Sequence, residues 1–301
     1  MRVFVTGATG LIGSGVCREL VAAGHRVVAL SRLPREGGGL EWVQGDASKP
    51  GLWQQSIDGC DAVIHLAGEP IFDARWSSTR KRELVDSRIE GTRQVVEAIG
   101  SAKAPPAALI SGSAVGFYGP RGDELLREDA APGEDFLAQL CVDWEAAAAN
   151  AQRYGVRVVC LRFGVVLSSR GGALARMLLP FRLGLGGPLG PSGRWFPWVH
   201  EDDAVGLALF ALEAKWAGPV NVVAPDAVTM GEFARALGSA LRRPAFFPVP
   251  RGALRLALGE SADFLSPGQK VIPAVSQSVG YAFKRNTLGD ALAESVGRKK
   301  P

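Results

Sequence analysis

The chain has 301 residues, of which 47% are hydrophobic and 21% charged, and 34 Lys and Arg against 30 Asp and Glu give a net charge of +4. This is the composition of an ordinary globular protein, and it excludes a disordered chain, a coiled coil and a collagen. The positive charge is too small for this length to indicate a nucleic-acid partner. The length itself predicts one large domain or two small ones.

The cysteines and histidines give no sign of a disulfide framework or of a metal site. No two cysteines form a Cys-x-x-Cys pair and each lies in an apolar stretch, so we expect buried, reduced thiols. The histidines are not at ligand spacing, so no metal is expected. These residues are Cys17, Cys60, Cys141 and Cys160, and His25, His65 and His200.

No segment approaches the roughly 18 consecutive apolar residues that span a bilayer. The apolar run at residues 3–5 breaks at Thr6 and Gly7, so it is not expected to be a signal peptide. We therefore expect a cytoplasmic protein with no membrane and no nucleic acid among its partners.

Strand patterns alternate with helical patterns through the first half of the chain. This alternation is typical of βαβ units and predicts a Rossmann-type α/β fold with a doubly wound parallel sheet. Right-handed crossovers place the carboxyl ends of the strands at one edge of the sheet, where ligands bind. The expected strands are residues 1–6, 25–30, 40–43, 61–67, 107–111 and 156–163, and the expected helices are 12–24, 77–100 and 134–154.

The pattern changes after residue 170. Residues 171–198 contain many Gly and Pro and cannot form one regular element, so we expect a loop-rich cap over the sheet edge. A helix is expected next, then a strand, and the chain from Thr229 is mostly helical. The predicted sheet domain is residues 1–170 plus about 200–224, and the predicted smaller C-terminal substrate domain is residues 171–199 and 225–301.

Three glycines separate the first strand from the first helix. A tight strand-to-helix turn needs one glycine, the approach of a pyrophosphate to backbone N–H groups needs a second, and helix–sheet packing uses the third. The helix N-terminus then presents the positive end of its dipole to the phosphates. The loop predicts dinucleotide binding, and the alternative is a tight turn without a ligand. The candidate residues are Gly7, Thr9, Gly10, Leu11, Ile12 and Gly13.

The Gly-x-x-Gly-x-x-Gly spacing, which opens with Thr-Gly-Ala-Thr-Gly, resembles the short-chain dehydrogenase/reductase superfamily. Later segments narrow the resemblance to its extended, epimerase-like branch, and it implies that Leu66, Ala67 and Gly68 contact the cofactor. These segments are His-Leu-Ala-Gly at 65–68, the serine-bearing stretch at 111–119 and Trp-Val-His-Glu-Asp-Asp at 198–203.

Longer segments are similar to one atypical subgroup, the epimerase family proteins, which are carried as NADP-dependent oxidoreductases. The resemblance runs from residue 1 to about residue 295. The segments that carry it are residues 65–71, 86–92, 178–190 and 268–273.

The end of the second strand indicates which dinucleotide is bound. An NAD enzyme has an acidic residue there that accepts from the ribose 2′-OH, whereas this chain has Ser31 and Arg32. Arg32 can pair with a 2′-phosphate and Ser31 can donate to it, which favours NADP(H). The alternative is that Arg32 is a solvated surface charge. The resemblance implies that Asp46 meets the adenine edge, and a solvated turn aspartate is the competing interpretation.

The expected reaction centre departs from the branch that it resembles. The resemblance implies a serine at the end of the fifth strand, which Ser113 supplies, and a Tyr-x-x-x-Lys on the next helix that acts as acid and base. Counting back from Glu145 places Leu137 and Cys141 at the tyrosine and lysine positions. Neither can perform that chemistry, and Cys141 is expected to be a buried apolar thiol.

Other polar residues are candidates near the nicotinamide. Arg88 replaces the usual Asn and could bind a ribose or phosphate oxygen, or an anionic substrate. Glu83 could accept from the ribose or from Arg88, and a salt-bridged helix face is the alternative for both. Tyr118 is the best available acid because it follows the serine strand, although a phenol with a pKa of about 10 needs a nearby cation at neutral pH.

Taken together, these patterns predict an NADP(H)-binding oxidoreductase or epimerase-like enzyme with Ser113 and Tyr118 as catalytic residues. The alternatives are a non-catalytic NADP(H)-binding or sensing protein and a sugar-nucleotide epimerase proper, against which the missing Tyr-x-x-x-Lys counts. The substrate is not indicated, and a homodimer stays open.

Overall fold

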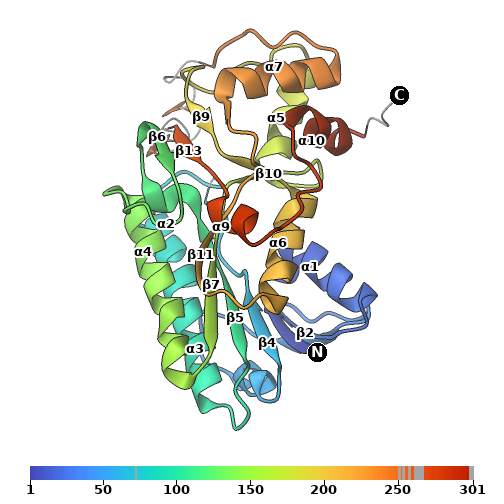
Figure 1. Ribbon diagram of the computed structural model, residues 1–301, viewed down its shortest axis with the longest axis vertical. Coiled ribbons are helices and arrows are strands. Elements are labelled where there is room, and N and C mark those ends of the chain that lie inside the picture. Colours follow the sequence, from blue (N-terminus) through green and yellow to red (C-terminus); the bar gives the residue numbers. More distant parts are fainter. Residues whose placement is uncertain (72, 250–251, 253–254, 257–258, 261–267, 298–301) are drawn as a thin grey trace.

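A seven-stranded, fully parallel sheet forms the centre of the computed structural model, which describes residues 1–71, 73–249, 252, 255–256, 259–260 and 268–297 (Figure 1). The strand order is β11-β7-β5-β4-β1-β2-β3. From β1 the chain adds strands first on one side, as β2 and β3, and then on the other, as β4, β5, β7 and β11. This is the doubly wound arrangement, so the predicted Rossmann-type fold is confirmed. The strands are β1 (Arg2–Thr6), β2 (Arg26–Ser31), β3 (Glu41–Gln44), β4 (Ala62–His65), β5 (Ala108–Ala114), β7 (Arg157–Phe163) and β11 (Gly218–Val222).

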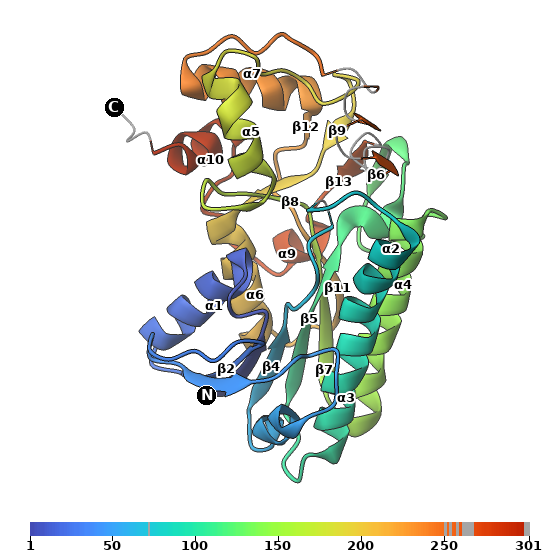
Figure 2. The same ribbon diagram turned by 180° about the vertical axis from the view of Figure 1, so that it is seen from behind.

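Helices cover both faces of this sheet (Figures 1 and 2). One face packs against α1 (Leu11–Ala22) and α6 (Glu201–Glu213), and the other against α3 (Gly91–Ser101) and α4 (Phe136–Ala149). The strands are apolar almost throughout because both of their faces are buried. Figure 2 shows the strands rising toward the C-terminal part of the chain, so their carboxyl ends face it.

The long helix expected at residues 77–100 is interrupted. It consists of α2 (Ser78–Val85), a π-helical turn at Asp86–Glu90 and α3, which continue one another along the chain. A π turn adds a residue to the helical repeat and often marks a functional site. This turn carries Arg88 and turns its side chain into the protein, where it is buried.

The segment expected to be loop-rich contains a helix, α5 (Gly172–Arg182), despite Pro180 within it. Leu174, Leu178 and Phe181 are buried on its inner face, and this apolar contact outweighs the hydrogen bond that proline removes. The C-terminal helices α7 (Met230–Leu241) and α10 (Leu288–Ser295) share that core with α5. The three helices lie together beyond the carboxyl edge of the sheet (Figure 1).

Short paired strands lie between the seven-stranded sheet and the C-terminal helices. The remaining strands and α-helix, among the residues that the structure describes, are β6 (Gly122–Leu126), β8 (Val165–Leu167), β9 (Trp195–Phe196), β10 (Trp198–His200), β12 (Val228–Thr229), β13 (Gln269–Val271) and α9 (Ala274–Ser278). β8 pairs with β10, β9 with β12 and β6 with β13. The domain boundaries that the sequence predicts stay a prediction. None of the described helices combines the length and the apolarity that crossing a membrane requires.

Candidate active site

The glycine loop joins β1 to α1, and its three glycine positions differ in whether the structure itself requires glycine there. Gly7 has a φ of +70°, and a Cβ there would lie 2.6 Å from the Leu66 carbonyl carbon. A Cβ on Gly13 would lie 2.1 Å from the Gly7 oxygen. Both positions therefore require glycine for the fold itself.

Gly10 differs from the other two glycines. Its φ of −77° suits any residue, and the Gly7 oxygen, at 3.2 Å, is the one described atom within 4 Å of where its Cβ would be. It is the N-cap of α1 and offers no side-chain cap, so the first amides of the helix are left for another acceptor. The space in front of Gly10 is thus open, and an anion such as a phosphate there could accept hydrogen bonds from these amides.

A cavity of about 600 Å³ lies in front of this loop. It runs along the carboxyl ends of β1, β2 and β4 to α2, the path that a dinucleotide takes across a doubly wound sheet. Most of the cofactor-binding candidates line it, namely Gly7, Thr9, Gly10, Ser31, Arg32, Asp46, Leu66, Ala67, Gly68 and Glu83.

The other cofactor candidates lie elsewhere. Leu11 and Arg88 line a second cavity, Ile12 packs against the sheet core, and Gly13 touches the Gly7 backbone. The two cavities are neighbours at the start of α1, because Gly10 lines the first and the next residue, Leu11, lines the second.

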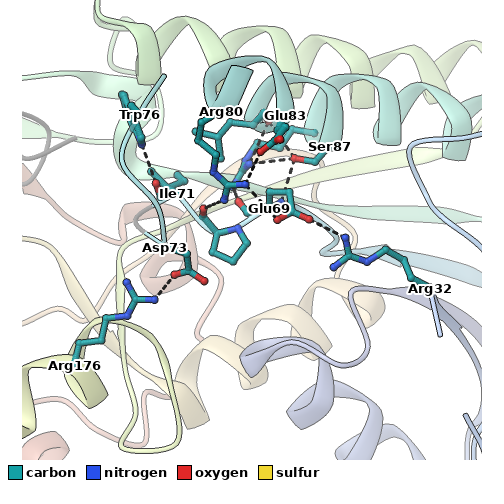
Figure 3. A network of polar contacts seen from close by, with 12 residues as sticks. Arg32, Glu69, Ile71, Asp73, Trp76, Arg80, Glu83, Ser87 and Arg176 are labelled. Atoms are coloured by element: carbon teal, nitrogen blue, oxygen red, sulfur yellow. Dashed lines mark hydrogen bonds and ion pairs between the residues drawn. The ribbon is translucent and has the colours of Figure 1, made fainter. Parts of the chain in front are cut away.

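Arg32 belongs to a chain of charges across the first cavity (Figure 3). Its Nη1 donates to Glu69 Oε1 at 2.9 Å, while 72% of its side chain stays exposed. Glu69 Oε2 lies 3.6 Å from Arg80 Nη1, and Arg80 donates to Glu83 Oε2 at 2.9 Å. Glu83 is thus held by Arg80, and Arg32 is fixed over the cavity with part of its guanidinium turned to solvent.

Glu69 follows β4 in the His-Leu-Ala-Gly-Glu-Pro segment, and the sequence analysis gave it no cofactor role. Its backbone is anchored as firmly as its side chain, since its N–H donates to Ser87 Oγ at 3.1 Å and its carbonyl accepts from Arg88 Nη2 at 2.9 Å. Asp73, three residues after this segment, forms an ion pair with Arg176 of α5 (Figure 3).

Arg88 is a buried cation at the π turn. Both terminal nitrogens donate to backbone carbonyls, Nη1 to Leu84 at 3.2 Å and Nη2 to Glu69, and the guanidinium lies 5.2 Å from the Trp144 ring centroid. Burial lowers the pKa of Arg88 to about 10, so it is still charged at neutral pH. It lines the second cavity, and its side chain has no contact with Glu83 among the hydrogen bonds of the described residues.

A buried hydrogen-bond relay ties β1, β4 and the π turn together. Thr92 Oγ1 donates to the Arg88 carbonyl at 2.6 Å, so it accepts from His65 Nε2 at 3.1 Å. His65 Nδ1 then accepts from Thr6 Oγ1 at 2.7 Å. Complete burial lowers the pKa of His65 to about 4, so the ring is neutral and structural.

The second cavity, of about 420 Å³, lies between the carboxyl ends of β5 and β7 and the C-terminal part of the chain. Ser113 lines it at the end of β5, where the sequence predicted it. Leu137 and Cys141 line it from α4, so the positions of the missing Tyr and Lys lie in the wall of this cavity. Burial raises the pKa of Cys141 to about 12, which keeps the thiol protonated.

Ser113 is held by a buried ion pair. Its Oγ donates to Glu145 Oε1 at 2.6 Å, and Glu145 receives two further hydrogen bonds of 2.8 Å from Arg162 Nε and Nη2. Although burial opposes it, the hydrogen-bonded ion pair with Glu145 raises the pKa of Arg162. Arg162 is therefore charged, and its ion pair with Glu145 fixes the serine at the cavity wall.

Tyr118 lies behind this pair rather than at the cavity surface. The ring is fully buried, its hydroxyl donates to Asn221 Oδ1 at 2.6 Å, and it accepts from Arg162 Nη1 at 2.9 Å. Burial raises the pKa of Tyr118, even though Arg162 opposes the shift. This location differs from the expected one because the chain turns inward at Val115–Tyr118, directly after β5.

Two smaller features complete the site. Asp46 is held by the Ser48 N–H at 3.0 Å and the Ser48 hydroxyl at 2.8 Å, and although partial burial opposes it, these bonds lower the pKa of Asp46. No three His, Cys, Asp or Glu side chains gather at metal-binding distance within the part of the chain that the structure describes.

Residues 3–224 match the NAD dependent epimerase/dehydratase family, and residues 249–295 match a domain of unknown function, DUF1731. The chain is 42% identical to the human epimerase family protein SDR39U1, over 98% of this chain and 100% of that protein. It is 40% identical to the chloroplastic SDR39U1 homologue of Arabidopsis thaliana, over 97% of this chain and 86% of that protein.

Solved structures agree with these similarities. The crystal structure of human SDR39U1 (isoform 2) with NADPH superposes with a TM-score of 0.89 at 40% identity, covering 98% of this chain and 99% of that chain. A nucleoside-diphosphate sugar epimerase from Corynebacterium glutamicum gives 0.79 at 32% identity, covering 99% of this chain and 58% of that chain.

Proposed function

Since the chain belongs to the NAD dependent epimerase/dehydratase family, we propose that it is an NADP(H)-dependent oxidoreductase whose reaction centre works without the Tyr-x-x-x-Lys pair. The observation that carries this proposal is the position of Ser31 and Arg32, which line the 600 Å³ cavity at the end of β2 where an NAD enzyme has a carboxylate. The NADPH in the human relative's crystal structure supports the same choice.

The glycine loop and the Arg32 charge chain divide the work of holding the cofactor. The first amides of α1 would donate to the pyrophosphate in front of Gly10, and Arg32 would pair with the 2′-phosphate. Glu69 holds one edge of the Arg32 guanidinium and so limits the side-chain freedom that binding must remove. When bound, NADPH would supply the hydride for reduction of a substrate.

Ser113 is the group that meets the reacting oxygen. Its hydroxyl hydrogen can turn from Glu145 to a substrate oxygen at little cost, because Glu145 Oε1 keeps its hydrogen bond from Arg162 Nε. A hydrogen bond aimed at the oxygen where negative charge develops stabilises the transition state for carbonyl reduction. Tyr118 acts through Arg162 as a positioning residue, since its own hydroxyl is committed to Asn221.

A non-catalytic NADP(H)-sensing protein is the competing proposal, and the missing Tyr and Lys are the observation that favours it. An enzyme must oxidise NADPH in the presence of some carbonyl compound, whereas a sensor only changes partners when the cofactor binds. A cytoplasmic location and a homodimer stay predictions.

The test is a fluorescence titration of the full-length protein with NADPH and with NADH. The wild type should bind NADPH more tightly than NADH. Arg32→Ala should lose about 1.5–3 kcal/mol of binding free energy for NADPH, which lowers the affinity about tenfold or more, and its affinity for NADH should change little. Arg93→Ala is the matched control, because Arg93 is also an exposed, ion-paired arginine (62% exposed) but lies on α3 outside the cavity. Equal affinities of the wild type for the two cofactors would reject the proposal.

A further inference from the structure

We infer that the 420 Å³ cavity takes an apolar carbonyl compound, such as an aryl ketone, rather than a sugar nucleotide. The inference rests on the proposed function and names its substrate class. The volume lies within the roughly 300–1,000 Å³ of ordinary small-molecule sites. The cavity adjoins the cofactor cavity and has Ser113 in its wall, so its occupant is the molecule that reacts.

The walls of this cavity are apolar on both sides. The sheet domain contributes side chains from α4 and from the segment after β4, and the C-terminal part contributes side chains from α5, β9 and α7. Such a surface gains free energy when it covers apolar area on a ligand. The residues are Ile71, Leu137, Leu140, Met177, Phe196 and Met230.

The polar groups of the lining are mostly engaged within the protein. Gln269 Nε2 donates to the Gly119 carbonyl at 2.9 Å, and Trp195 Nε1 donates to Asp123 Oδ1 at 2.7 Å. Asp135 Oδ1 accepts from the Ala138 N–H at 2.9 Å as the N-cap of α4. These groups orient the walls, and they leave few hydrogen bonds to offer to a ligand.

Arg88 is likewise committed to two backbone carbonyls. Among the described lining residues, this leaves three donors without such a commitment, namely Ser113, the Arg194 guanidinium and the unpartnered indole N–H of Trp144. One hydroxyl matches one carbonyl oxygen. A sugar nucleotide brings several hydroxyls and two phosphates. Burying them against Met177 and Phe196 would cost more hydration than these few donors restore.

The reaction for such a substrate balances with the proposed cofactor. The carbonyl carbon accepts a hydride from NADPH, which is oxidised to NADP⁺, and the C=O π electrons move onto oxygen. The oxygen takes a proton through the Ser113 hydroxyl, which solvent restores. The product is the corresponding alcohol.

The test uses the full-length protein loaded with NADP⁺ and two probes, 2-acetylnaphthalene and UDP-glucose, with binding followed by calorimetry. The apolar ketone should bind, and UDP-glucose should not bind at the same concentration. With NADPH in place of NADP⁺, the ketone should accelerate the loss of absorbance at 340 nm.

Two variants on α5 sharpen the comparison. Met177→Gln places an amide in the cavity wall and should weaken binding of the ketone about fivefold, which is the effect of roughly one lost methylene contact. Leu179→Gln is the control, because Leu179 is 66% exposed on the same helix. Neither residue lines the cofactor cavity, so NADPH affinity should be unchanged in both.

The outcomes separate the substrate class from the cofactor. Binding of UDP-glucose in preference to the ketone, an unchanged ketone affinity in Met177→Gln, or binding of neither probe by a protein that binds NADPH would overturn the apolar substrate class alone. A wild-type protein that fails to bind NADPH would overturn the proposed function as well. The comparison of the two probes on the wild type decides the inference even if Met177→Gln is unstable.

Discussion

Replacing Gly10 with valine should abolish cofactor binding while leaving the protein folded. The backbone at Gly10 has a φ of −77°, which valine adopts, and the one described contact of an added Cβ is the Gly7 oxygen at 3.2 Å. That oxygen needs to move by only a few tenths of an ångström. The branched side chain would therefore project mainly into the cavity, where the pyrophosphate is expected.

The magnitude follows from the hydrogen bonds that the phosphate would lose. The N-terminus of α1 has no side-chain cap, so its amides are the donors to the phosphate, and each charge-assisted bond contributes about 1.5–3 kcal/mol. The loss of two such hydrogen bonds would cost about 3 kcal/mol or more of binding free energy, which weakens NADPH binding at least about 100-fold.

Gly13→Ala provides the contrasting substitution in the same loop. Its Cβ would lie 2.1 Å from the Gly7 backbone oxygen, so the loop or the helix must shift. We expect a loss of stability of about 1–3 kcal/mol or more. Thermal unfolding followed by circular dichroism and fluorescence titration with NADPH measure both variants. If Gly10→Val has a native spectrum and binds NADPH as the wild type does, the loop is not the phosphate site.

Three further predictions concern the second cavity and the buried relay. In steady-state assays with a reactive ketone, Ser113→Ala should slow NADPH oxidation at least about tenfold, a loss of about 1.4 kcal/mol of transition-state stabilisation. Tyr118→Phe should slow it less, because the Tyr118 hydroxyl acts through Arg162. Equal losses would show that Tyr118 contacts the reacting atoms. Cys141→Ala should leave turnover nearly unchanged, because a thiol with a pKa of about 12 is protonated at neutral pH, and a dead variant that still binds NADPH would establish a thiol mechanism. His65 has a pKa of about 4 in the folded protein, against an ordinary value of 6.5. As the pH falls below 6.5, the unfolded chain therefore takes up the His65 proton before the folded protein does. The stability that neutral His65 contributes is complete above pH 6.5, and the free energy of unfolding falls by roughly 3 kcal/mol as the pH drops to 4. Denaturant unfolding of the wild type and His65→Gln across this range checks it, and parallel pH curves would contradict it.

Local patterns in the sequence were enough to predict the sheet and the phosphate loop. Strands buried on both faces are continuous apolar runs, and the turn at Gly7 needs a positive φ, so both leave a trace in neighbouring residues. The residues at the carboxyl ends of β2 and β4 could be placed for the same reason, because a parallel sheet brings these ends to one edge. Ser113 was located by the family resemblance, which places a serine at the end of the fifth strand.

Only the tertiary structure decided what these residues do. Arg32 meets Glu69 across 37 positions of the chain and Tyr118 meets Asn221 across 103, and no local pattern encodes such distances. The inward turn after β5 takes Tyr118 out of the cavity, and the π turn directs Arg88 toward Trp144. The α5 helix forms despite Pro180 because Phe181 and its neighbours find a core contributed by α7 and α10. Backbone conformation is set by nearby residues, whereas hydrogen-bond partners and burial depend on which distant side chains the completed fold brings into contact.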